Sequence, residues 1–172
     1  MSVFIALLRA VNVGGTGKLP MTELKAMCEA SGFTDVKTYI ASGNVVFRAA
    51  VDAGKAKAAL EARLTDYAGK PVGVIIRTPT EMAAVLAANP FPDAPGNRTV
   101  AIFLETAPPA GSLDDVKHRK SEILALGTRE IYVSYGDGMA DSRLVIPAAK
   151  AGTARNMNTV ARLAGMAAAL EA

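Results

Sequence analysis

The sequence has 172 residues, with 19 lysine and arginine residues against 16 aspartate and glutamate residues, one histidine, one cysteine and no tryptophan. A chain of this length buries roughly 70% of its unfolded surface, so a globular core is expected without cross-links. One cysteine excludes an intrachain disulfide, and one histidine with one cysteine falls short of the usual zinc ligand sets. No apolar run approaches the roughly 18 residues of a membrane span, and residues 1–13 lack a secretion signal. We therefore expect a cytoplasmic protein that needs no cofactor and has no membrane partner.

The positive charge is concentrated near the two ends of the chain. Residues 1–22 and 142–170 contain no acid and six basic residues, which are Arg9, Lys18, Arg143, Lys150, Arg155 and Arg162. The net charge of +3 is too small to define a nucleic-acid-binding protein by itself. If the fold brings the two ends together, they form one positive surface. The alternative is that acid-free windows arise by chance in a chain with few charges.

The first half of the chain has the hydrophobic periodicity of six alternating elements. In order, they are a strand over 2–8, a helix between Pro20 and Gly32, strands over 36–40 and 45–47 joined by a tight turn, a helix from Asp52 to about Gly69, and a strand over 72–76. This βαββαβ order is that of the ferredoxin-like split βαβ unit.

The second half is predicted to repeat this order after a break at residues 89–92. Thr78 and Glu81 form a capping box that starts a helix over 79–88. The elements that follow are a strand over 100–104, a helix over 112–126 started by a second capping box at Ser112 and Asp115, a strand over 130–135, a hairpin turn at 137–138, and a long helix over 154–170. A shift of 95 residues places 36–40 on 131–135 and Gly43 on Gly138, which indicates an internal duplication.

These elements predict an α+β protein made of duplicated ferredoxin-like halves, with mainly antiparallel sheets and a C-terminal helix. The first half spans residues 1–78, a helix and connecting loop span 79–98, and the second half with the C-terminal helix spans 99–172. We expect the parts to form one compact domain.

The glycine-rich segment 12–18 follows the first strand and is a candidate anion-binding loop, because glycines let backbone N–H groups approach a phosphate. It matches neither the Walker motif, which needs Ser or Thr after Lys18, nor the GxGxxG motif, which needs glycine at Pro20. Asn12, Gly14, Gly15 and Lys18 are its candidate binding residues. A tight structural turn is the alternative.

The start of the last helix is a second candidate. With Thr153 as N-cap, Arg155 would lie in the first turn, where a cation costs about 0.3 to 1 kcal/mol unless an anion offsets it. Asn156, Asn158 and Thr159 follow on the same stretch, and together they suit a phosphate or carboxylate. The alternative is that Arg155 pairs with an acid such as Asp35 or Asp141.

No catalytic constellation is found. Cys28 lies on the apolar side of its helix and is expected to be buried and inert. His118 falls off the apolar stripe of its segment, which predicts a solvent-facing side chain. Ser42 and Asn44 flank Gly43, so a hairpin turn explains them as well as a binding role does.

The runs LLRAVNVGG, YIASGNVVF, NPF and GTARNMNTVARL together resemble a bacterial domain-of-unknown-function family, number 1697. The resemblance implies two ferredoxin-like halves and no assigned activity. Its pattern falls on Arg9, Asn12, Val13, Gly14, Gly15, Ser42, Gly43, Asn44, Arg155, Asn156, Asn158 and Thr159. Two positions depart from it. Met157 stands where the family usually has tryptophan, which makes ring stacking there doubtful, and Ala10 stands where it usually has glycine.

Three functions are compatible with the sequence. The leading one is a non-enzymatic cytoplasmic module that binds an anionic partner, a nucleic acid or a phosphorylated ligand, through the first loop and the last helix. The second is an enzyme acting on a small anionic substrate, with Arg9 and Arg155 as anion clamps. The third is a structural or interaction protein, which would form a homodimer.

Overall fold

A computed structural model describes residues 1–12 and 18–172 of the chain. Two of the predicted binding residues, Gly14 and Gly15, lie outside the described residues. The chain forms two compact units. The first consists of Met1–Met82 together with Leu163–Ala172, and the second of Ala83–Arg162.

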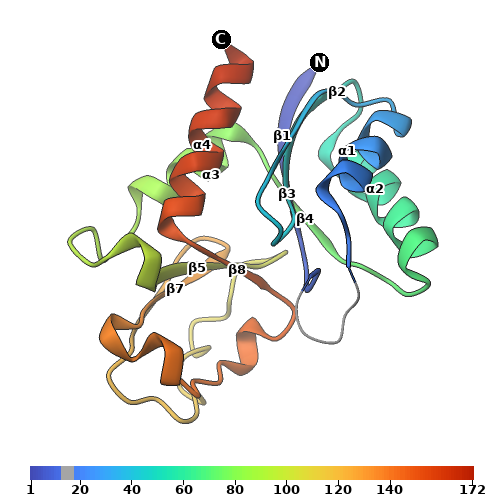
Figure 1. Ribbon diagram of the computed structural model, residues 1–172. Helices are drawn as coiled ribbons and strands as arrows, with labels where there is room; N and C mark the ends of the chain where they lie inside the picture. The colour runs from blue at the N-terminus through green and yellow to red at the C-terminus, as the bar shows by residue number, and fades with distance from the viewer. Residues whose placement is uncertain (13–17) are drawn as a thin grey trace. The chain divides into compact units, whose positions relative to one another are not determined.

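The first unit contains a four-stranded antiparallel sheet and two helices. Its elements are β1 (Ser2–Leu8), α1 (Met21–Ala30), β2 (Thr34–Tyr39), β3 (Asn44–Ala49), α2 (Ala53–Ala68) and β4 (Val74–Arg77). The strands lie in the order β2-β3-β1-β4, and α1 and α2 lie side by side on one face of the sheet (Figure 1). The order of elements and the strand order are those of the ferredoxin-like unit, as predicted.

The core of this unit lies between that face of the sheet and the two helices. Alternate residues of β1, such as Phe4, Ala6 and Leu8, point into it, and α2 contributes Leu60 and Leu64. All of these side chains are buried. This alternation is what a strand with a core on one face requires.

Local signals in the sequence explain where these elements begin and end. The Asp52 carboxylate accepts a hydrogen bond from Lys55 N at 2.9 Å and caps α2. Helix α2 ends at Gly69, which has a φ of +72°, and Gly32 after α1 has a φ of +88°. Such left-handed residues are common just after helices because glycine adopts them without steric cost.

Helix α3 (Pro79–Ala87) follows β4. The predicted capping box is present. Thr78 N donates to Glu81 Oε1 at 2.8 Å, and Glu81 N donates to Thr78 Oγ1 at 3.1 Å. Each bond satisfies a donor at the helix start that has no partner within the helix.

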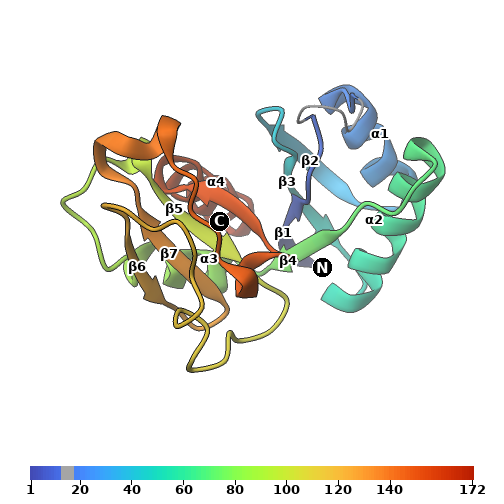
Figure 2. The same cartoon turned by 90° about the horizontal axis from the view of Figure 1, so that it is seen from below.

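The second unit contains another four-stranded antiparallel sheet. Its strands are β5 (Thr99–Phe103), β6 (Ile123–Leu126), β7 (Glu130–Ser134) and β8 (Thr153–Asn156), and they lie in the order β6-β7-β5-β8 (Figure 2). Short 3₁₀ segments, η1 (Gly96–Arg98), η2 (Gly136–Asp141) and η3 (Pro147–Ala149), lie in the connections. The core on one face includes Val100, Ile102, Ile131 and Val133.

The helix predicted over 112–126 was wrong. Residues 112–122 form turns and irregular structure, and the remainder is strand β6. Ser112 does not cap a helix, because its N–H and its hydroxyl both donate to the Pro109 carbonyl. Leu113 and Val116, whose spacing indicated a helix, pack against the core from this irregular segment.

The predicted boundary between the last loop and the last helix was also wrong. Residues 153–156 form strand β8, which pairs with β5, and helix α4 begins at Met157 and ends at Glu171. The residue that caps α4 is Asn156, whose Oδ1 accepts from Thr159 N at 2.9 Å. Arg155 is therefore a strand residue, paired in register with Ala101, and not a first-turn helix residue.

The duplication appears in the sheets rather than in the predicted 95-residue shift. Each sheet has the same strand order when β1 to β4 are matched with β5 to β8. Strand β7 thus corresponds to β3, although the shift had placed it on residues 36–40. Residues 137–138 lie in η2 and not in a hairpin turn. The chain is an α+β protein with two four-stranded antiparallel sheets and a C-terminal helix, in agreement with a duplicated ferredoxin-like fold.

Candidate anion-binding site

A pocket of about 360 Å³ lies in the first unit, where the segment after β1 meets the end of α2 and the connection to β4. We call it the basic pocket. Its described lining residues are Arg9, Ala10, Val11, Lys18, Leu19, Leu64, Tyr67, Ala68, Lys70, Pro71, Val72 and Gly73. The volume falls within the range of small-molecule sites.

Backbone contacts hold two walls of the basic pocket together. Arg9 N donates to the Gly73 carbonyl at 2.9 Å, which continues the line of β1 past its last paired residue. The Arg9 side chain runs along Gly73, since a Cβ built there would lie 3.7 Å from both Arg9 Cβ and Arg9 Cδ. The aliphatic part of the Arg9 side chain is thus positioned by the connection to β4, against which it packs.

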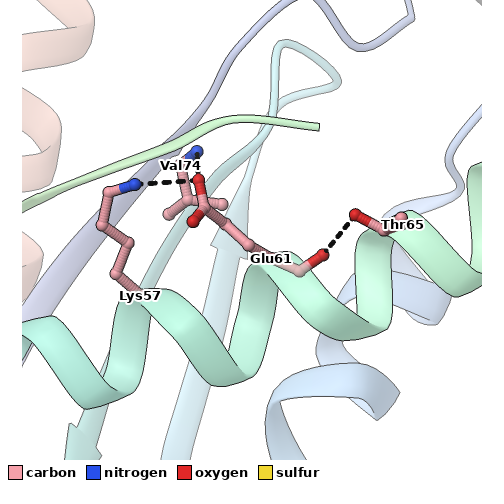
Figure 3. Close-up of polar contacts among 4 residues, drawn as sticks. All are labelled: Lys57, Glu61, Thr65 and Val74. Atoms are coloured by element: carbon pink, nitrogen blue, oxygen red, sulfur yellow. Dashed lines mark hydrogen bonds and ion pairs between the residues drawn. The ribbon is translucent and has the colours of Figure 1, made fainter. Parts of the chain in front are cut away.

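Helix α2 is tied to the start of β4 by Glu61 (Figure 3). Its Oε2 accepts from Val74 N at 3.0 Å and from Lys57 Nζ at 2.9 Å. Thr65 Oγ1 donates back to the Glu61 carbonyl at 2.8 Å. The bond to Val74 N fixes the β4 end of the connection that carries Lys70. Lys70 follows the last turn of α2, where a cation interacts favourably with the helix dipole.

Asn12 fixes the segment that follows β1. Its Nδ2 donates to the carbonyls of Leu19 and Ala41, both at 2.8 Å, and its Oδ1 accepts from Leu19 N at 2.6 Å. The residue has a φ of +55°, which asparagine tolerates better than most residues. The amide therefore joins the two ends of the segment 12–19 and attaches them to the turn between β2 and β3.

The predicted residues Ser42 and Asn44 build that turn. Asn44 is buried and donates through Nδ2 to the Tyr39 carbonyl and to Ser42 Oγ, both at 2.9 Å. Gly43, at a φ of +90°, packs so closely on the first strand that a Cβ would lie 2.7 Å from Val11 Cγ2 and 2.8 Å from Leu8 Cβ. In these contacts Asn12, Ser42 and Asn44 bind backbone carbonyls and one another, which is a structural role.

The basic pocket combines positive charge with an apolar wall. Arg9, Lys18 and Lys70 are exposed, and the described lining includes no aspartate or glutamate. Leu19, Leu64 and Val72 supply apolar surface, and the Tyr67 ring is 47% exposed. Such a site matches a ligand with an anionic group and a compact apolar or aromatic body.

The predicted residues of the last segment lie in the second unit, and their described contacts are local. Arg155 is 5% exposed, and its Nη1 donates to Thr153 Oγ1 at 2.6 Å and to the Ala154 carbonyl at 2.9 Å. Burial lowers the pKa of its guanidinium to about 10. Asp35, one acid proposed as its partner, instead pairs with Arg48 at 3.1 Å.

The remaining residues of this segment surround the start of α4. Asn156 is its N-cap, and Thr159 is buried. Asn158 is exposed and lies so close to Gly96 that a Cβ on this glycine would collide with its Oδ1. Met157 is buried, so the position where the resemblance implies tryptophan faces the interior.

The sequence analysis missed two lining residues, Tyr67 and Lys70. Tyr67 has helical spacing from the buried Leu60 and Leu64, which favours a buried side chain, but it is half exposed. Lys70 follows Gly69, and only its place beside the segment after β1 connects it with Arg9. A cation directly after a helix-ending glycine is the one local signal that marks it.

Two expectations about reactive residues are confirmed. Cys28 is fully buried, and desolvation raises the pKa of its thiol to about 12. His118 is exposed. Among the residues that the structure describes, no group of His, Cys, Asp and Glu side chains is arranged to hold a metal ion. Over residues 1–12 and 18–172, no helix has both the length and the hydropathy to cross a membrane.

The fold and the pocket define an α+β protein with a basic small-molecule-sized site and no recognisable reaction chemistry among its described residues. The family model described as "Protein of unknown function (DUF1697)" matches residues 1–132, and the chain belongs to this family. This confirms the resemblance found in the sequence.

The fold is shared with a solved structure, a conserved bacterial protein from Streptococcus pneumoniae. The match has a TM-score of 0.75 and 20% sequence identity, and it covers 96% of this chain and 98% of that chain. At this identity the likeness concerns the fold alone. No curated protein matches the sequence significantly.

Proposed function

We propose that this protein is a cytoplasmic, non-enzymatic binding protein for a small anionic ligand, phosphorylated or carboxylated, which it holds in the basic pocket. The observation that carries the proposal is the convergence of Arg9, Lys18 and Lys70 around an apolar wall, with no carboxylate in the described lining. Each charge-assisted contact to such a ligand contributes about 1.5 to 3 kcal/mol.

The expected ligand has two parts. Its anionic group contacts the three cations, and its apolar or aromatic part packs on Tyr67, Leu64 and Val72. Because the pocket is of small-molecule size and has three cations, a compact ligand fits it better than a long polyanion does.

The alternative of an enzyme acting on the same ligand has less support. The described lining offers Tyr67 and three cations, but no carboxylate, histidine or cysteine to serve as general base or nucleophile. The contribution of the last segment to binding stays a prediction. The buried Arg155 and the capping role of Asn156 make a structural role the simpler explanation of these two residues.

The proposal is tested by a thermal-shift screen with matched pairs of charged and uncharged compounds. Suitable pairs are adenosine 5′-monophosphate with adenosine, glucose 6-phosphate with glucose, and benzoate with benzyl alcohol. A ligand present at 100 times its Kd stabilises the fold by about 2.7 kcal/mol, which corresponds to several degrees for a chain of this size. We expect at least one charged member to exceed its uncharged partner. Equal shifts in every pair would contradict the proposal.

A further inference from the structure

A second basic feature lies in the second unit and shares no residue with the basic pocket. An open groove of about 650 Å³ is lined by His118, Arg119, Lys120, Ala140, Asp141, Ser142 and Arg143. We call it the basic groove. It is built from two chain segments, the run Lys117–Lys120 before β6 and residues 140–143, which include the end of η2. The sequence analysis assigned no role to this run.

The two segments of the basic groove are held together by backbone bonds. Lys117 N donates to the Val145 carbonyl, and Val145 N donates to the Lys117 carbonyl, both at 2.9 Å. His118 then turns the chain with a φ of +59°. A non-glycine residue at positive φ is uncommon and needs support from its surroundings.

Glu122 supplies much of that support. Its Oε1 accepts from Lys120 N at 2.6 Å, and its Oε2 accepts from Ser142 Oγ at 2.5 Å. Arg119 Nε donates to the Glu122 carbonyl at 2.8 Å. The buried carboxylate thus joins both segments and fixes the backbone from which the cations project.

The cations of the basic groove face solvent. Arg119, Lys120 and Arg143 are all exposed, and Asp141 is the one acid in the described lining. The His118 side chain is exposed as well. Among the described residues, Lys120 and Arg143 have no side-chain hydrogen bond or ion pair. The described lining also has no phenylalanine, tyrosine or tryptophan, the side chains that form the usual stacking platforms of single-strand binders.

We infer that the basic groove binds the phosphate backbone of a nucleic-acid duplex, without reading its sequence. Regularly spaced phosphates match several cations on a fixed, open surface, and the lack of a large aromatic platform favours a duplex over unpaired bases. This site is separate from the basic pocket, and it goes beyond the proposed function. Lys117, beside the groove, extends the basic surface.

The test is fluorescence anisotropy of the full chain with a labelled 20-base-pair DNA duplex of random sequence, repeated between about 50 and 200 mM salt. If Arg119, Lys120 and Arg143 each neutralise one phosphate, log K falls against log salt with a slope of about −2.7. The variant Lys120→Glu/Arg143→Glu removes two of these contacts. It should bind at least tenfold more weakly and show a slope near −1.

The matched control is Lys25→Glu/Lys55→Glu, which changes the net charge equally at two exposed positions of the first unit. Circular dichroism and thermal unfolding verify that each variant is folded. No duplex binding by the wild type at the lowest salt would overturn the inference, as would equal losses in the two double variants. Binding to phosphatidylserine vesicles but not to duplex would also overturn it. A Lys18→Gln/Lys70→Gln variant should leave duplex binding unchanged. This variant distinguishes a failure of the basic-groove inference from a failure of the proposed ligand binding in the basic pocket.

Discussion

Asn12 is the residue on which the geometry of the basic pocket depends most directly. Its amide makes three hydrogen bonds, two to Leu19 and one to Ala41. The sequence analysis predicted that Asn12 contacts a ligand. The sequence alone does not distinguish an amide that binds a ligand from one that binds the backbone. The structure assigns the amide to the second role in its described contacts, and through Leu19 it holds the backbone next to Lys18.

Asn12→Asp tests this role, since it keeps the size of the side chain and the acceptor for Leu19 N. The two donated bonds are lost, and a charge faces two carbonyl oxygens. We expect the free energy of unfolding to fall by about 1 to 3 kcal/mol in urea titrations. The exposed Asn97 serves as control, and Asn97→Asp should change the free energy of unfolding by less than about 0.5 kcal/mol. Equal effects of the two substitutions would show that the hydrogen bonds of the Asn12 amide do not stabilise the fold.

Ala10 shows how a family position relates to backbone conformation. The residue has a φ of +56°, a region that costs an alanine about 1 to 2 kcal/mol. The resemblance puts glycine at this position, and glycine adopts this conformation without that cost.

Ala10→Gly should therefore stabilise the protein by about 0.5 to 1 kcal/mol, after allowance for the greater freedom of glycine in the unfolded chain. Ala26→Gly, on the exposed side of α1, should destabilise it by about 1 kcal/mol. Chemical denaturation of both variants gives the comparison. A loss of stability in Ala10→Gly similar to that of Ala26→Gly would show that the backbone at residue 10 is not strained.

At the scale of elements, prediction succeeded where capping signals and periodicity agreed. Asp52 and Gly69 delimit α2, and Thr78 with Glu81 starts α3, as expected. In the second unit, Leu113, Val116 and Ile123 have helical spacing, yet the first two pack from a turn and the third lies in an edge strand. The sequence shows the spacing, but the pairing of β6 with β7 that overrides it is a long-range contact.

The predicted start of α4 was wrong for a related reason. Thr153 and Asn156 are both good N-caps, and the alanine-rich segment beyond them favours the longer helix. Because residues 153–156 pair with β5 as a strand, the helix begins after them and Asn156 is its N-cap. The unusual first-turn arginine, which had suggested an anion there, was a consequence of choosing the wrong cap.

Glu122 makes the connection between segments of the second unit sensitive to pH. The hydrogen bond from Ser142 and then that from Lys120 N lower the pKa of its carboxyl below the ordinary 4.5. The folded state thus holds the carboxylate ionised where the unfolded state would protonate it. The stability it contributes is present above pH 4.5 and is lost as pH falls through the folded pKa.

Thermal unfolding between pH 3 and 6 tests this dependence. Glu122→Gln should be less stable than wild type at pH 6, and the difference should shrink toward pH 3. Asp115→Asn, an exposed position in the same unit, should run parallel to wild type over the whole range. A difference between Glu122→Gln and wild type that stays constant with pH would contradict the assigned role.

For the whole molecule, the fold class was predictable and the candidate site was predictable in part. The strand order β2-β3-β1-β4 followed from alternating elements in the first half. The second sheet repeats this order although no α-helix lies between β5 and β8. Lys18 was identified from its place in the glycine-rich loop, and Arg9 from the acid-free N-terminal segment and the family resemblance. Tyr67 and Lys70 join them only because α2 returns the chain to the end of β1, which is a property of the tertiary fold.

The central claim is that the cations of the basic pocket bind an anionic ligand. Isothermal titration calorimetry tests it most directly, with the charged compound that gives the largest thermal shift, on wild type, Lys18→Gln/Lys70→Gln and the control Lys25→Gln/Lys55→Gln. Because each of the two lost contacts is worth about 1.5 to 3 kcal/mol, the pocket variant should raise Kd by about two to four orders of magnitude. The control should leave Kd within about twofold of wild type. A pocket variant that binds as tightly as the control would contradict the claim.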